Sequence, residues 1–266
     1  MAVRTFYWKP GKKGFFQKKS ASSFRIGNAG DLLNRDLVHH LYGDEPLNVK
    51  DEGKRLLLVG SVAHRALTGD ILAGVGTKGS PLPDPSGLDV EIRGVRGPIT
   101  YDALAAAGFD VSGVRFQYDP GLLVNELYPA ESATPAEPGR VAFIPHYRDR
   151  LDYKRSKSYT TVDIDCEPAT LAREIARAEY VLTSSLHGLV FAHALGRPVT
   201  LIAPIRAEPI LKYQDYVASV GLPWVDPVDL DTALAAPKPT SPADIDFDAS
   251  AFDFPTIEEL RARGIA

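Results

Sequence analysis

Short apolar runs that alternate with helical patterns are the feature that most constrains the fold of this 266-residue chain. Residues 55–59 are almost continuously apolar, which is typical of a strand buried on both faces of a parallel sheet. We expect further strands at 4–8, 70–74, 90–96, 114–118, 140–148, 161–164, 180–182 and 198–203, and helices at 31–41, 101–107, 168–178, 186–195, 209–220 and 256–263. Repeated strand–helix order predicts the α/β class.

A proline-rich segment divides this series in two. Residues 127–139 contain three prolines together with Ala, Ser and Thr, a composition typical of a linker. Strand–helix order resumes beyond it, which predicts two doubly wound, Rossmann-like domains that face a cleft. We expect an N-terminal domain at 1–127, a linker at 128–139, a C-terminal domain at 140–225, and a tail at 226–266, largely loop, whose terminal helix folds back on the body.

The composition argues against several classes of protein. A net charge of −4 argues against general nucleic-acid binding. Cys166 is the single cysteine, so no internal disulfide can form and a reducing compartment is expected. The sequence has no apolar run of roughly 18 residues, which a membrane-spanning helix needs, and its charged N-terminus does not resemble a signal peptide. We therefore expect a cytoplasmic protein.

The N-terminal stretch is strongly basic. Residues 9–19 contain five lysines and no acid, and Trp8, Phe15 and Phe16 are interleaved with them. This pattern fits a cradle for an anionic substrate, or a peripheral contact with anionic lipid on the inner face of the cell membrane. A solvated loop is the third interpretation.

A strand followed by a helix places polar groups where α/β proteins bind ligands. The strand at 180–182 is followed by three small hydroxyl residues at 183–185, which are typical of a helix N-cap. His187 and Gly188 then fall in the first turn of the helix, where free N–H groups favour an anion. His187 is therefore a candidate proton donor to an anionic substrate, unless it only caps or packs.

Other candidates lie at the same predicted edge. Asp31 follows Gly30 and either caps the helix that begins there or contributes a carboxylate to the site. Glycine-rich loops at 60–64 and 74–79 follow two strands, but neither matches a P-loop. Arg96 precedes a helix N-terminus and could grip a phosphate or carboxylate, or form a surface salt bridge.

The motifs collected along residues 4–221 are, in order, Asn28-x-Gly-Asp31 with Asn34, Gly60-Ser61, Gly74-x-Gly76, Val95-Arg-Gly-Pro-x-Thr100, Asp119-Pro120, Ile144-Pro-His-Tyr147, Ser184-Ser-Leu-His-Gly188, and Lys212 with Asp215-Tyr216. Taken together, they resemble the polysaccharide pyruvyl transferase family, most closely the short members that decorate bacterial exopolysaccharide repeat units, as in xanthan or succinoglycan synthesis.

The resemblance implies a fold like that of GT-B glycosyltransferases. It also implies transfer of pyruvate from phosphoenolpyruvate to two hydroxyls of a sugar, which forms a cyclic ketal and releases phosphate. By the same resemblance, His187 corresponds to the proposed general acid and Arg96 to a residue that contacts the donor. Several members carry an arginine where this chain has Ser185. Arg148, Lys212 or a lysine of 9–19 could supply the missing charge.

These considerations define the expected site. His187 and Asp31 are the expected catalytic residues, and Asp31 would accept a hydroxyl proton or orient the acceptor. The expected donor-binding residues are Arg96, Ser184, Ser185, Gly188, Arg148 and Lys212. The expected acceptor or loop residues are Asn28, Gly30, Asn34, Ser61, His64, His146 and Tyr147.

We expect no cofactor and no metal site, because no Cys or His pair has ligand spacing. The expected partners are phosphoenolpyruvate and a sugar acceptor in the form of a lipid-linked oligosaccharide. Two other functions fit the same scaffold. One is a nucleotide-sugar glycosyltransferase, and the other is a non-catalytic saccharide-binding subunit of an export complex.

Overall fold

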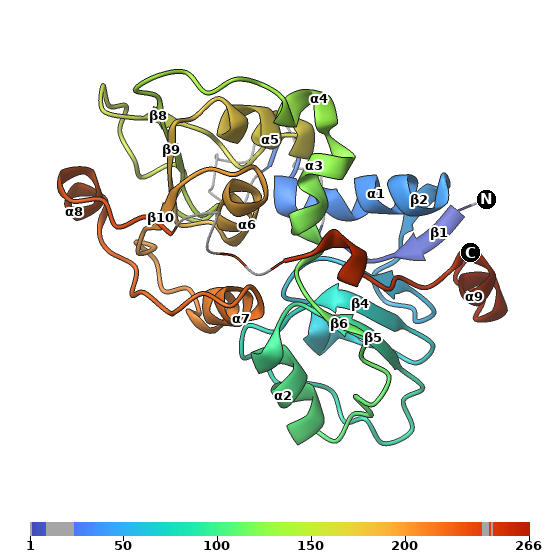
Figure 1. Cartoon of the computed structure of the whole chain (residues 1–266). Helices are drawn as coiled ribbons and strands as arrows, with labels where there is room; N and C mark the ends of the chain where they lie inside the picture. Colours follow the sequence, from blue (N-terminus) through green and yellow to red (C-terminus); the bar gives the residue numbers. More distant parts are fainter. Residues whose placement is uncertain (1, 9–23, 241–244, 246) are drawn as a thin grey trace, which may run out of the picture.

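The computed structural model describes residues 2–8, 24–240, 245 and 247–266. The basic stretch 9–19 lies outside the described residues. Within them, two parallel sheets and surrounding helices confirm the α/β class (Figure 1). The first sheet has the order β2-β1-β3-β4-β5-β6, with β1 (Ala2–Thr5), β2 (Glu45–Asn48), β3 (Leu56–Leu57), β4 (Ile71–Val75), β5 (Glu91–Val95) and β6 (Phe116–Gln117).

The second sheet has the order β10-β9-β7-β8. Its strands are β7 (Val141–Ile144), β8 (Thr160–Thr161), β9 (Tyr180–Thr183) and β10 (Val199–Leu201). Every pair of neighbouring strands in both sheets is parallel. The carboxyl ends of the strands of each sheet therefore lie at one edge, where ligands bind in α/β proteins.

β2 is a strand that sequence patterns did not predict. It carries Pro46, alternates between exposed and half-buried residues, and pairs only with β1. Proline has no backbone N–H to donate to a neighbouring strand, so it is tolerated at an edge strand such as this one. Neither the hydrophobic periodicity nor the composition of β2 therefore indicates a strand.

The expected helices are confirmed, with ends that differ by a few residues. They are α1 (Ala29–Tyr42), α2 (Pro98–Ala106), α5 (Pro168–Ala176), α6 (Leu186–Ala194), α7 (Leu211–Ser219) and α9 (Ile257–Ala262). None of the described helices is long and apolar enough to cross a membrane. Three short helices add to these. They are α3 (Val124–Leu127), just before the linker, α4 (Pro129–Ser132), within it, and α8 (Leu230–Ala235), in the tail.

One expectation about α1 is wrong. The N-cap is Asn28, whose side chain accepts a hydrogen bond from the Gly30 amide at 3.0 Å, and not Asp31. Asp31 lies inside the first turn. Its carboxylate is therefore available for another role.

The C-terminal segment packs against the first sheet, next to the N-terminal strand β1. The backbone amide of Arg4 donates to the carbonyl of Ile265 at 2.8 Å, so the two termini lie close together (Figure 1). Phe252 and Phe254 pack edge-on against Phe116 of the edge strand β6. These aromatic contacts cover an edge that would otherwise be exposed.

A buried ion pair fastens α7 to the first sheet. Arg96, directly after β5, donates from Nε to the Asp215 carboxylate at 2.9 Å, and both side chains are fully buried. Asp215 also accepts from the amide and hydroxyl of Thr100 at 2.9 and 2.6 Å. A side chain at Gly97 would come within 2.1 Å of the Asp215 carbonyl, so the backbones are in close contact here.

Asp215→Asn should destabilise the protein strongly, because it leaves the Arg96 charge buried without a counter-ion. Loss of one partner of a buried pair costs roughly 3–5 kcal/mol. Urea unfolding measures this difference. Asp226→Asn is the matched control, since Asp226 is exposed and accepts a hydrogen bond from the Trp224 side chain. Its effect should stay within about 0.5 kcal/mol, and an equally small effect of Asp215→Asn would contradict the inference.

Candidate active site

A pocket of about 320 Å³ lies where loops that follow strands of both sheets meet. Ser61 follows β3, Lys78 follows β4, His146 follows β7 and Ser185 follows β9. The lining residues are Trp8, Phe24, Asn28, Asp31, Gly60, Ser61, Val62, His64, Arg65, Lys78, His146, Tyr147, Arg148, Ser185, Leu186, His187, Glu208 and Lys212. Four are cationic and two are acidic, so the pocket is locally basic in an acidic chain.

Most of the predicted site residues line this pocket. They are His187, Asp31, Ser185, Arg148, Lys212, Asn28, Ser61, His64, His146 and Tyr147. The other five, Arg96, Ser184, Gly188, Gly30 and Asn34, are buried behind its walls. The residues that sequence motifs mark therefore divide into those that face the pocket and those that shape it.

His187 packs tightly against the first turn of α1. A methyl group at Gly30 would come within 1.8 Å of the His187 Nδ1 atom, so only glycine fits there. The Nε2 atom of His187 and the Oδ2 atom of Asp119 are both buried without a hydrogen-bond partner in the described structure. Burial lowers the pKa of His187, the Asp119 charge opposes this, and the Arg96 and Lys212 charges lower the pKa further. His187 is therefore neutral at pH 7 in the unliganded protein.

The pKa of Asp31 is shifted in the opposite direction to that of His187. Burial raises its pKa from 3.8 to about 7, although the charges of Lys212 and Lys78 oppose this. No described residue hydrogen-bonds its carboxylate, whose pocket-facing position leaves room for a ligand. A carboxyl group that titrates near neutral pH is suited to accept a proton and return it.

Glu208 neutralises the cations contributed by the second half of the chain. Its carboxylate lies 2.6 Å from the Lys212 Nζ atom, 3.5 Å from Arg148 and 3.6 Å from the His146 Nε2 atom. Burial alone would raise the pKa of Glu208, but the Lys212 charge and hydrogen bond hold it below its ordinary value. Burial and the nearby Lys212 charge lower the pKa of His146 to about 3, so His146 is neutral.

Arg96 lies in the wall and not in the pocket. Besides the Asp215 pair, its guanidinium donates to the Ser61 hydroxyl at 2.9 Å and to the carbonyl of Thr77. Its side chain is fully buried, and it reaches the pocket only through Ser61. In the structure it therefore positions Ser61 and the loop at Thr77, and the donor contact that the resemblance implies stays a prediction.

The remaining wall residues hold loop backbones. The Asn34 side chain both accepts from the Val59 amide and donates to the Val59 carbonyl. The Ser184 hydroxyl accepts from the His146 amide at 2.7 Å. A methyl group at Gly188 would come within 2.2 Å of the Thr183 hydroxyl.

Sequence reasoning missed several functional candidates. Lys78 lies in the glycine-rich loop 74–79, which the sequence places at the predicted ligand edge, so this position is a usable signal. Arg65 and Glu208 lie in segments without a motif. Their presence in the pocket depends on contacts between distant parts of the chain.

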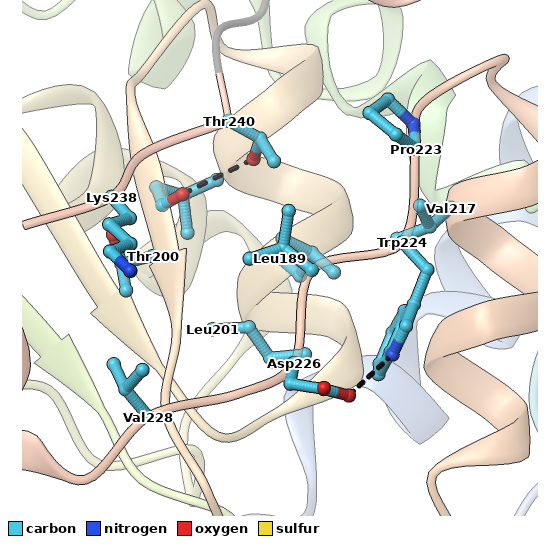
Figure 2. Close-up of a pocket in the computed structure, with 12 residues that line it drawn as sticks. Leu189, Thr200, Leu201, Val217, Pro223, Trp224, Asp226, Val228, Lys238 and Thr240 are labelled. Atoms are coloured by element: carbon cyan, nitrogen blue, oxygen red, sulfur yellow. Dashed lines mark hydrogen bonds between the residues drawn. The ribbon is translucent and has the colours of Figure 1, made fainter.

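A second pocket is small, about 30 Å³, and its walls are mostly apolar (Figure 2). Trp224 on its wall donates to Asp226 at 2.8 Å. His193 lies beside it, but Tyr216 and Thr240 bond both of its ring nitrogens, which indicates a structural histidine. Among the described residues, no group of three or more His, Cys, Asp or Glu could hold a metal ion.

Asp31→Asn should stabilise the protein in a pH-dependent way. Because the pKa of Asp31 is raised in the folded state, its carboxyl favours folding at low pH, and this contribution is lost as the pH rises from about 4 to about 7. The rise in the pKa of Asp31 from 3.8 to about 7 corresponds to a loss of at most roughly 4 kcal/mol in the free energy of unfolding. Contact with pocket water reduces this, so we expect the variant to be more stable by about 2 kcal/mol above pH 7.

Urea unfolding at about pH 4 and about pH 8 measures this effect. The variant and the unmodified protein should be similar at the lower pH, where both carry a neutral group at this position. A stability difference that does not change with pH would contradict the raised pKa of Asp31.

Comparison with known proteins shows where the chain is similar to others. A family model described as polysaccharide pyruvyl transferase matches residues 88–204. The chain is 28% identical over 213 residues to "Uncharacterized protein L143" of Acanthamoeba polyphaga mimivirus. The aligned region covers 73% of this chain and 71% of that protein. It is 26% identical over 210 residues to "Succinoglycan biosynthesis protein ExoV" of Rhizobium meliloti (strain 1021). The aligned region covers 74% of this chain and 63% of that protein.

No solved structure matches the chain significantly. The matched family segment contains both Arg96 and His187. These findings confirm the resemblance drawn from the motifs and the expectation of a transferase enzyme.

Proposed function

From the match to the polysaccharide pyruvyl transferase family, we propose that the protein transfers pyruvate from phosphoenolpyruvate to two hydroxyls of a sugar in an exopolysaccharide repeat unit. The product would be a cyclic ketal, and inorganic phosphate would leave. The observation that carries this proposal is the pocket that brings His187 and Asp31 together with several cations. The proposal includes a GT-B-like pair of domains, divided by the linker 128–139, that both contribute to this pocket.

The first step needs an acid and a base. Protonated His187 would give its proton to the vinyl CH₂ of phosphoenolpyruvate, which leaves a cationic centre at the carbon that bears the phosphate. One sugar hydroxyl attacks this carbon, and the Asp31 carboxylate accepts its proton. The intermediate then holds a methyl group, the carboxylate, the phosphate and one sugar oxygen on the same carbon.

The second step closes the ketal. The carbon–phosphate oxygen bond breaks, and the second sugar hydroxyl attacks the same carbon. The proton of this second hydroxyl passes to neutral His187, while Asp31 gives its proton to the departing phosphate. Both side chains regain their starting states, and the two hydroxyl protons are accounted for by the new methyl group and the phosphate.

Donor binding would make His187 a competent acid. In the unliganded protein, burial and two nearby cations lower the pKa of His187. A bound phosphate adds negative charge beside the ring, which raises the pKa of a histidine. This ordering limits protonation of His187 to the donor complex.

His187→Gln should abolish ketal formation while the protein stays folded. Loss of a general acid slows such a reaction roughly 10²–10⁴-fold. The measurement is phosphate release from phosphoenolpyruvate with candidate glycosides, together with a product mass increased by one pyruvate minus one water. His39→Gln on the exposed face of α1 is the matched control and should keep full activity.

Undiminished phosphate release by the His187 variant would refute its role as acid. A product that instead gains a hexose from a nucleotide sugar would replace the proposed reaction with glycosyl transfer. Saccharide binding without either product would indicate a non-catalytic subunit.

We further propose that the acceptor is lipid-linked and that residues 9–19 contact anionic membrane at the inner face of the cell membrane. The support is the five lysines of that stretch, each of which contributes about 1 kcal/mol near an anionic surface. Deletion of 9–19 should abolish binding to vesicles of anionic phospholipid and leave activity on a soluble glycoside intact. Unchanged vesicle binding would refute the membrane contact.

A further inference from the structure

The pocket lacks one cation that the resemblance leads us to expect. Ser185, where several family members carry an arginine, lines the pocket with a hydroxyl and no charge. A donor with both a phosphate and a carboxylate needs positive charge that is not already neutralised by the protein. The question is which described cation supplies it.

The cations from the second half of the chain are already compensated. Lys212 and Arg148 share the carboxylate of Glu208. Arg96 is neutralised by Asp215 and does not line the pocket. These three side chains hold the walls together more than they offer charge to a ligand.

Two cations from the first half have no ion-pair partner among the described residues, although the Lys78 charge acts on the Asp31 carboxyl. Lys78 follows β4 on the glycine-rich loop, and Arg65 ends a short 3₁₀ helix (Ala63–Arg65) after β3. Neither makes an ion pair with an acidic side chain among the described residues, and both line the pocket. The Arg65 guanidinium lies over the rings of Phe6 and Trp8, 5.4 and 5.7 Å from their centroids, which orients it without neutralising it.

Both charges act on one histidine. His64 lies beside Arg65, and the positive charges of Arg65 and Lys78 add to burial in lowering its pKa. The Nδ1 atom of His64 is buried and has no hydrogen-bond partner among the described residues. A backbone hydrogen bond with Ser61 raises the pKa of His64 and so opposes these effects. Two cations without ion-pair partners beside a histidine whose Nδ1 atom is unpartnered are unfavourable, and an anion would relieve this.

We propose that Lys78 and Arg65, together with His64, form a phosphate subsite that supplies the charge absent at Ser185. Lys78 is suited to bind as a compact point charge, and the fixed fork of Arg65 to donate two parallel hydrogen bonds. The assignment of this phosphate to the donor rests on the proposed function. The same chemistry would fit a diphosphate that links a saccharide to lipid, so the test separates the two sources.

Calorimetric titration of the full chain with phosphoenolpyruvate, inorganic phosphate and a saccharide diphosphate tests the subsite. Lys78→Met should weaken phosphoenolpyruvate and phosphate binding at least about tenfold, or about 1.4 kcal/mol, whereas Lys78→Arg should keep affinity within about threefold. Lys50→Met is the matched control, because Lys50 is 62% exposed and lies outside the pocket. Circular dichroism verifies that each variant is folded.

The outcomes distinguish the subsite from the proposed function. Phosphoenolpyruvate binding that Lys78→Met leaves unchanged would overturn the subsite while the pyruvyl transfer stands. Lys78-dependent binding of the saccharide diphosphate, without binding of phosphoenolpyruvate, would support the subsite and overturn the donor. Binding of none of the three anions would overturn the subsite.

The His64 side chain offers a second readout that needs no activity. Its ring signals in a proton–nitrogen spectrum can be assigned with His64→Gln. The pKa of His64 should rise when inorganic phosphate is added, and should also rise in unliganded Lys78→Met, because each change removes net positive charge beside the ring. A titration curve of His64 that phosphate does not move would overturn the subsite.

Discussion

The buried pair between Arg96 and Asp215 is the interaction on which the arrangement of this site depends. It joins the end of β5 to α7, the helix that carries Lys212 into the pocket, and its remaining donors hold Ser61 and the Thr77 carbonyl. Two desolvated charges are stable only as a pair, so neither can leave for a ligand without a large cost. The arginine that the motif predicts as a ligand contact is thus held by the protein's own side chains and backbone.

Burial sets the electrostatics of the pocket as much as charge does. His187 and His146 lose their positive charge because their rings are desolvated, and Asp31 loses negative charge for the same reason. The unliganded pocket thus keeps its histidines neutral and its base half-protonated near neutral pH. In the proposed reaction, an anionic donor would raise the pKa of His187, and proton transfer would then depend on the presence of substrate.

Much of the fold was predictable because its signals are local. The apolar runs, the hydroxyl residues at 183–185 and the capping box of α9 between Thr256 and Glu259 all predict structure from neighbouring residues, and the structure contains them. The failures are local as well. β2 carries Pro46 at a sheet edge, and Asn28 replaces Asp31 as cap because its side chain reaches the Gly30 amide.

The sequence by itself determined the α/β class, the place of His187 in the first turn of a helix and the ligand edge, since each follows from hydrophobic period and capping. Only the tertiary structure decided which charges are free to act. Arg96 meets an aspartate 119 positions away, and Glu208 gathers Lys212 and Arg148, which leaves Lys78 and Arg65 without acidic partners among the described residues. Charge compensation depends on distances between remote side chains, and no local pattern encodes those distances.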